Sequence, residues 1–161
     1  MRTFLALVLG LALVGTASTL GGEEHPLNLA GFSPVVSPFT GPVNPVRGLG
    51  GGGLPWKIAS GRAELKANGR LEVEVRGLVL VNTGTNPIPN FAAIVSCRSV
   101  DAAGAPAIIN LVAGTAPATA AGDAEIEGTV QLPSPCIAPI VFVAIPSTAT
   151  SPARWLAASG F

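Results

Sequence analysis

Two pairs of carboxylates have a spacing that catalytic acids can use. Glu72 and Glu74, like Glu125 and Glu127, are separated by one residue in segments that alternate between apolar and charged side chains. Residues i and i+2 of a strand share a face and lie about 6–7 Å apart, which overlaps the separations used in glycoside hydrolysis. Arginines alternate with the first pair, so a solvated, ion-paired strand face explains the pattern equally well. We therefore predict no catalytic residue here and rank a hydrolase last among the functions.

The other reactive residue types form no catalytic set. A serine or cysteine nucleophile needs a nearby base, and the single histidine, His25, lies in a proline- and glycine-rich segment where we expect it to be solvated. The sequence has no G-x-S-x-G, phosphate-loop or H-E-x-x-H motif. One histidine and two cysteines are too few for a multi-ligand zinc or copper site. The prediction is a protein that is not an enzyme and that has no cofactor and no metal site.

One loop has the composition of a binding site. Residues 82–90 are polar and rich in proline, and they join two segments that are apolar on both faces. Loops at the end of a β domain commonly carry binding residues, so a small-molecule or carbohydrate site is one interpretation. The other is a rigid turn whose side chains satisfy its own backbone. The loop has no carboxylate, which argues against calcium. The candidate binding residues are Asn82, Thr83, Thr85, Asn86 and Asn90.

The two cysteines predict a disulfide. Cys97 closes one apolar run and Cys136 opens another. An N-terminal export signal implies an oxidising compartment, and two cysteines allow one intramolecular pairing. We expect Cys97–Cys136 and a thiol count of zero on the denatured, unreduced mature protein.

Alternating segments predict strands with one wet face. Residues 62–66, 70–76 and 124–132 alternate apolar or small side chains with polar ones, which indicates antiparallel sheets. Asn68-Gly69 predicts a hairpin between the first two. A two-residue loop would set Leu65 opposite Glu72, whereas the three-residue loop 67–69 sets Leu65 opposite Leu71 and gives Gly69 a left-handed conformation. We predict the second register.

The remaining apolar segments complete an all-β fold. They are short and bounded by proline, asparagine or glycine, which favours buried strands over helices. About seven strands with regular turn signals predict an immunoglobulin-like antiparallel β-sandwich; a small β-barrel is the alternative. We expect Trp56 and Trp155 to pack in the core or at its ends. The segments are residues 78–81, 91–95, 107–112, 137–145 and 153–161.

The N-terminus predicts export. One arginine, an apolar run over residues 4–14 and small residues after it are typical of a secretory signal peptide, which we place at residues 1–17. Residues 18–55 contain recurring prolines and a glycine run, and we expect a mostly irregular spacer. An added edge strand is the alternative there. Residues 56–161 are then a single β domain, secreted or held at the cell envelope, with no transmembrane span after signal removal.

The composition limits the kinds of molecule that this protein could bind. The chain has 161 residues, of which 48% are hydrophobic and only 11% charged, with a formal net charge of zero. Nucleic-acid binding needs clustered Lys and Arg, so we predict no nucleic acid. The few charges mark the wet strand faces, which leaves a neutral, mildly apolar exterior suited to contact with a protein or cell surface.

Several short motifs are spread over the second part of the chain: residues 56–61, 71–81, 86–90, Cys97, 122–127, 132–136 with Pro139, and 155–158. Together they resemble a group of small secreted bacterial proteins that have no assigned activity. The resemblance covers about residues 56–161 and implies secretion and a two-cysteine β domain, with no catalytic or binding residue. Our leading expectation is thus a secreted non-enzymatic β-sandwich with a structural or interaction role; the alternative is a binding module that uses loop 82–90.

Overall fold

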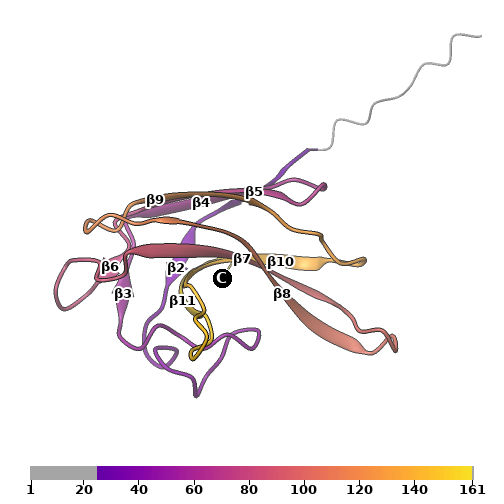
Figure 1. Ribbon diagram of the computed structural model, residues 1–161, viewed down its shortest axis with the longest axis horizontal. Helices are drawn as coiled ribbons and strands as arrows, with labels where there is room; N and C mark the ends of the chain where they lie inside the picture. Colours follow the sequence, from indigo (N-terminus) through magenta and orange to yellow (C-terminus); the bar gives the residue numbers. More distant parts are fainter. Residues whose placement is uncertain (1–24, 161) are drawn as a thin grey trace, which may run out of the picture.

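The computed structural model describes residues 25–160, and this part of the chain is all-β, without helices (Figure 1). The predicted signal peptide, residues 1–17, lies outside the described residues. The strands are β1 (Leu27–Ala30), β2 (Phe32–Pro34), β3 (Trp56–Lys57), β4 (Ser60–Leu65), β5 (Arg70–Arg76), β6 (Val79–Leu80), β7 (Asn90–Val100), β8 (Pro106–Pro117), β9 (Ala124–Thr129), β10 (Ile137–Ile145) and β11 (Arg154–Ser159).

Two larger sheets make up most of the fold. One has the strand order β1-β4-β5-β9 and the other β2-β11-β10-β7-β8, while β3 and β6 form a small two-stranded sheet. Every strand pair is antiparallel, as the alternating segments predicted. The two larger sheets lie one above the other (Figure 1). Among the described residues no sheet closes into a barrel, so the barrel alternative is not supported.

The core lies between the larger sheets. Inward-facing side chains of β5, such as Leu71 and Val75, are fully buried, and so are Phe91 of β7 and Val143 of β10. Burying an aliphatic or aromatic side chain contributes about 1.5–3 kcal/mol each, so this shared core is what joins the sheets. Trp56 and Trp155 are 2% and 3% exposed, which confirms that both pack in the interior.

The β4–β5 hairpin has the predicted register. Leu65 lies opposite Leu71 and Ala63 opposite Val73, so the apolar side chains of both strands share the core face. The Gly69 N–H donates to the Lys66 carbonyl at 2.9 Å, and Gly69 has a φ of +84°. A Cβ at this position would also collide with the Val130 carbonyl oxygen. Gly69 is therefore required both by the turn and by the chain that crosses it.

The structure differs from the predicted irregular spacer at its start and has the alternative there, namely added edge strands. Residues 27–34 form β1, which pairs with β4, and β2, which pairs with β11. Gly31 stands between the two strands with a φ of +78° and lets the chain pass from one larger sheet to the other. The weak alternation of this segment hid these strands, which are specified by tertiary contacts: Val35 is fully buried, and Phe32 packs where Gly61 has no side chain.

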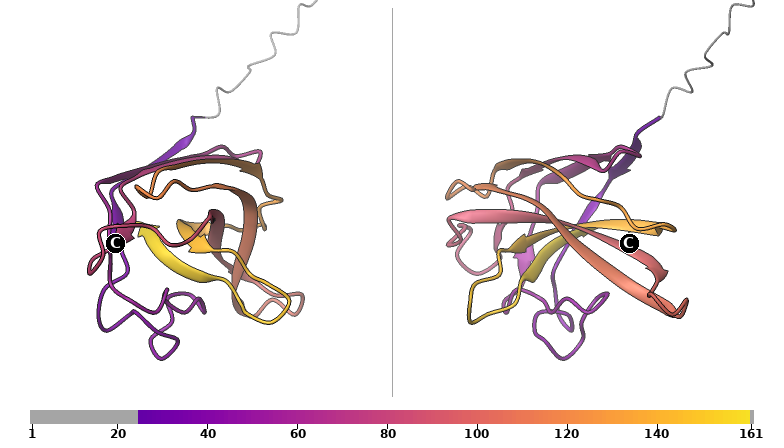
Figure 2. Two further views of the ribbon diagram at one scale, coloured as in Figure 1. Left: turned by 60° about the vertical axis from the view of Figure 1, so that its left-hand side comes forward. Right: turned by 45° about the vertical axis from the view of Figure 1, so that its right-hand side comes forward.

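The rest of that segment is irregular, as predicted, but it is packed rather than free. The Arg47 guanidinium donates to the backbone carbonyls of Ser96 and Ala138 at 3.1 and 2.7 Å. The backbone N–H of Trp155 donates to the Gly50 carbonyl at 3.0 Å. Residues 36–55 thus cover part of the outer face of the five-stranded sheet and form a third layer, which Figures 1 and 2 show as loops below β11.

Candidate functional site

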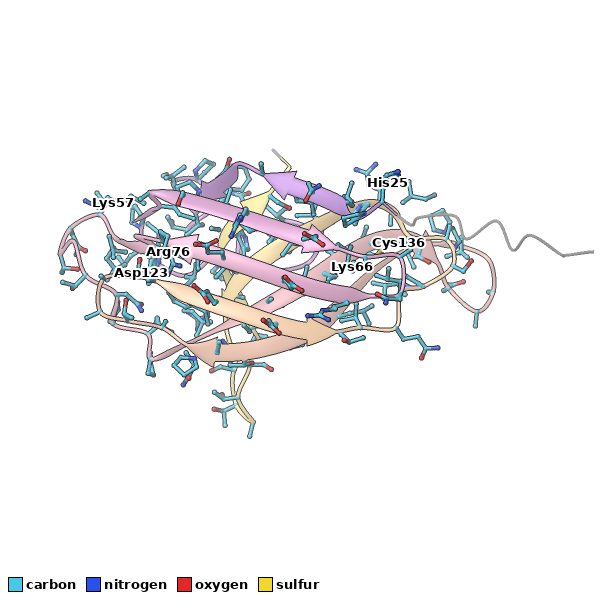
Figure 3. All side chains as sticks on the ribbon, turned by 90° about the horizontal axis from the view of Figure 1, so that it is seen from above. His25, Lys57, Lys66, Arg76, Asp123 and Cys136 are labelled. Carbon is cyan, nitrogen blue, oxygen red and sulfur yellow. A yellow bond between two sulfur atoms is a disulfide. The ribbon has the colours of Figure 1, made fainter. Side chains whose placement is uncertain are left out.

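Half of the charge of the protein lies on one sheet face. The chain has nine Lys and Arg and nine Asp and Glu, and the outer face of the β1-β4-β5-β9 sheet carries four of the former and five of the latter (Figure 3). We call this surface the charged face. Its residues are Arg62, Glu64, Lys66, Arg70, Glu72, Glu74, Arg76, Glu125 and Glu127.

The strand order brings the two predicted carboxylate pairs together. Glu72 lies opposite Glu127 and Glu74 opposite Glu125 on neighbouring strands, and all four line a shallow hollow. Glu64 of β4 lies opposite Glu72 on the other side of β5, in line with Glu127. The alternation of the sequence predicted the face of each residue, but the proximity of the two pairs depends on β9 pairing with β5, for which the sequence holds no local signal.

Ion pairs occupy most of these carboxylates. Glu74 accepts hydrogen bonds from Arg62 at 2.6 Å and from Arg76 at 3.0 Å, and Arg76 also reaches Glu125 at 2.6 Å. The two arginines hold the pKa of the Glu74 carboxyl below its ordinary value, Arg62 having the larger effect. An anion held in this way is a poor proton donor near neutral pH, so the geometry favours a wet, ion-paired surface over acid catalysis.

The Glu74 network predicts an acid-sensitive contribution to stability. The folded pKa of Glu74 is lowered, so its contribution is complete above the unfolded pKa near 4.5 and is lost as the pH falls through the folded value. We expect Glu74→Gln to flatten the dependence of the unfolding free energy on pH below about pH 4.5. Denaturant titrations at several pH values measure this. Glu127→Gln, on the same face but outside the network, is the control, and an equal flattening in both variants would contradict the assignment.

The candidate binding loop 82–90 is internally bonded at its centre. Asn86 is 8% exposed; its side-chain amide donates to the carbonyls of Ile88 and Thr119 at 2.8 and 2.9 Å, and its side-chain oxygen accepts the Ile88 N–H at 2.8 Å. Thr83 and Thr85 contact each other at 3.3 Å. Asn82 and Asn90 are exposed. The arrangement matches the rigid-turn interpretation, in which the polar side chains hold the loop to residues near 119.

Asn86→Ala should therefore lower stability. The substitution leaves the Ile88 N–H and two carbonyls without their side-chain partner, and we expect a loss of about 1–3 kcal/mol in unfolding free energy. Chemical denaturation measures it. Thr83→Ala is the matched control in the same loop, with an expected change within about 0.5 kcal/mol. Equal effects of the two substitutions would show that Asn86 does not anchor the loop.

The predicted disulfide is confirmed. Cys97 of β7 and Cys136, just before β10, are bonded, with their Cα atoms 5.0 Å apart. The bond joins two neighbouring strands of the five-stranded sheet at the end where residues 130–136 return from β9. The Cys97 residue of this bond is fully buried. No free cysteine remains in the described part of the chain.

A second surface is apolar. Four large aliphatic side chains that are 41–57% exposed lie on the outer face of β7, β8 and the start of β10. The strand register places all four on one side of the sheet, around the exposed Arg98, which lies opposite both Ile108 and Ile137. The covering segment 36–55 reaches the same area, because the Asn110 side-chain amide donates to the Arg47 carbonyl at 2.9 Å. We call this surface the apolar face. Its members are Val100, Ile108, Val112 and Ile137.

Sequence reasoning missed the apolar face as a site. The sequence predicts residues 137–145 as a strand that is apolar on both faces and residues 107–112 as a further strand, and it assigns neither segment an exposed face. β7 is indeed almost wholly buried, but β8 alternates between exposed and partly buried side chains. A strand of this kind lies at the edge of a sheet, which only the tertiary arrangement determines.

The structure offers no metal cluster or membrane-spanning helix within the described residues, and comparison with known proteins identifies no relative. Within residues 25–160 there is no cluster of three or more His, Cys, Asp or Glu that could hold a metal ion. In the same range no helix is long and apolar enough to span a bilayer. Comparisons with protein-family models, curated proteins and solved structures give no match, so the resemblance to small secreted bacterial proteins stays a prediction.

Proposed function

We propose that this protein is an exported, non-enzymatic module that acts by surface contact, with a structural or interaction role at the cell envelope or outside the cell. The observation that carries the proposal is the apolar face. Exposed groups of aliphatic side chains on soluble proteins mark surfaces that bind other molecules. The charged strand neighbour of these side chains is Arg98, an exposed cation that lies opposite Ile108 and Ile137. The low charge of the chain outside the charged face supports the same role.

Export is part of the proposal. The order of residues 1–17 supports a signal peptide, and a disulfide is consistent with an oxidising extracellular compartment. The resemblance noted above supports a bacterial origin. We also propose that the two larger sheets form an immunoglobulin-like sandwich, on the strength of their antiparallel pairing and shared core.

The alternative, a small-molecule or carbohydrate module that uses loop 82–90, has less support. Carbohydrate sites commonly offer an exposed aromatic ring for stacking, yet both tryptophans are buried. The buried asparagine of the loop uses its amide within the fold. No other observation favours this function.

Substitutions on the apolar face test the proposal. We expect the purified protein to bind the envelope fraction of the producing cells, and Val100→Ser/Ile137→Ser to lose most of that binding because the contact area becomes polar. Val81→Ser is the control, because Val81 is 54% exposed but lies away from the face. Co-sedimentation with envelope fractions and retention on a hydrophobic resin measure the two effects. Equal binding by all three proteins would refute the assignment of this face.

A further inference from the structure

Strand β8 has an unusual free edge. It is 12 residues long, lies at the end of the five-stranded sheet and contains no charged residue. Natural edge strands are normally protected from pairing with other strands by charged side chains, bulges or a covering segment. The first seven residues of β8, Pro106–Val112, have a regular register with β7 and no bulge.

The register shows which backbone groups face outward. The Asp101 N–H donates to the Ala105 carbonyl at 2.8 Å, so this pair is of the hydrogen-bonded type. Hydrogen-bonded and non-hydrogen-bonded pairs alternate along an antiparallel ladder. The pairs of β7 with Ala107, Ile109 and Leu111 are therefore of the bonded type. It follows that the backbone N–H and C=O groups of Ile108, Asn110 and Val112 point away from β7, toward the free edge.

The other half of β8 is covered. After Val112 the register with β7 shifts, which adds a bulge at Ala113. From there β8 runs against β9, so closely that a Cβ on Gly114 would collide with the Glu127 carbonyl oxygen. For Ile108, Asn110 and Val112 the described chain provides no strand on the outer side. The free edge is thus confined to residues 106–112, which Figure 2 shows extending away from the two sheets.

This edge is complementary to itself. An antiparallel pairing of two β8 strands centred on Asn110 sets each Ile108 opposite the Val112 of the other copy. The outward-facing N–H and C=O groups of Ile108, Asn110 and Val112 of both edges then find partners. The side chains of Ile108 and Val112, which are 45% and 57% exposed, meet on the apolar face. Since neither edge carries a charge, the pairing brings no like charges together.

We propose that two copies of this chain dimerise along β8, with Asn110 of one copy opposite Asn110 of the other, and form one continuous sheet. The inference rests on the proposed contact function and names its partner. An extended segment of another protein could add to the same edge. A second copy is favoured because its register uses the outward groups of Ile108, Asn110 and Val112 on both edges and pairs the two exposed aliphatic side chains with each other.

Proline at position 108 is the first test. The Ile108 N–H faces outward, so proline there leaves the pairing with β7 intact but removes a donor from the edge, where proline is tolerated. We expect the mature protein to sediment as a dimer at micromolar concentration and Ile108→Pro to raise the dimer Kd roughly tenfold or more. Circular dichroism and the Tm establish that the variant is folded. A monomeric wild type at all concentrations, or a folded Ile108→Pro that dimerises like the wild type, would overturn the proposal.

Charge reversal at the two-fold axis tests the register. The Asn110 side-chain amide donates to the Arg47 carbonyl at 2.9 Å, and Asn110→Lys and Asn110→Glu both lose this bond, so each variant is the control for the other. Each variant alone places like charges opposite each other in a homodimer, whereas a mixture of the two places opposite charges together. We expect each variant alone to dimerise weakly and the equimolar mixture to form the heterodimer with roughly tenfold tighter affinity. No preference for the heterodimer would overturn the register. A monomeric wild type that still binds envelopes through the apolar face would overturn dimerisation and leave the proposed function standing.

Discussion

Loss of the Cys97–Cys136 disulfide should reduce the unfolding free energy by about 4 kcal/mol. The cysteines are 39 residues apart in sequence, and the chain-entropy model gives about that value for a loop of this length. The bond closes the segment that contains β8 and β9, and therefore restricts a large part of the unfolded chain. A typical domain has only about 5–15 kcal/mol in total, so we expect a fall in Tm of roughly 10–20 °C.

Two ways of removing the bond separate its effects. Reduction of the wild type removes only the cross-link, whereas Cys97→Ala/Cys136→Ala also removes the buried sulfur of Cys97. We expect the double variant to be less stable than the reduced wild type by about 1 kcal/mol, because a cavity remains. Thermal and urea unfolding with and without reductant measure both values. Unchanged stability after complete reduction would show that the bond does not stabilise the fold.

Gly128→Ala should destabilise the protein by about 3 kcal/mol, the upper end of the usual range for overpacking. A Cβ at Gly128 would lie far inside contact distance of the Ala113 carbonyl oxygen, and Gly114 faces Glu127 in the same way. The two glycines thus allow β8 and β9, which belong to different larger sheets, to approach at one corner. The colliding atoms are backbone atoms that cannot rotate away, so the strands must separate, and overpacking of this kind costs about 1–3 kcal/mol, occasionally more.

The matched control is another glycine. Gly41→Ala places its Cβ in open space without a positive φ, so we expect a change within about 0.5 kcal/mol. Gly114→Ala should resemble Gly128→Ala, since both widen the same corner. Equilibrium unfolding in urea compares the three. If Gly128→Ala proves as mild as Gly41→Ala, the contact between β8 and β9 is looser than described.

Local patterns predicted most strands and their faces. The segment 70–76 became β5 and 137–145 became β10 without a change of boundary, and the β4–β5 register followed from keeping Leu65 and Leu71 on one face. These predictions succeeded because side-chain alternation and turn chemistry are properties of neighbouring residues. The prediction of the disulfide was correct because two cysteines allow a single intramolecular pairing.

Tertiary contacts determine the features that local sequence patterns did not predict, namely strands β1 and β2 and the packing of residues 36–55. β1 and β2 have no convincing alternation and form because partner edges exist on β4 and β11. Proline and glycine in residues 36–55 indicated a free spacer, yet Arg47 and Gly50 bind the five-stranded sheet through hydrogen bonds that composition does not encode. For the candidate sites, alternation predicted the correct faces of the carboxylates, but their proximity depends on the strand order.

The order in which a chain is synthesised gives the β2–β11 pair a further meaning. Phe32 of β2, near the start of the described residues, pairs with Ser159 of β11, near their end. Pairing between residues so distant in sequence is slow to form. Until β11 has been synthesised, β2 has no partner strand, and the inner face that Phe32 fills stays incomplete. A chain cut short before residue 154 would therefore leave β2 without its partner.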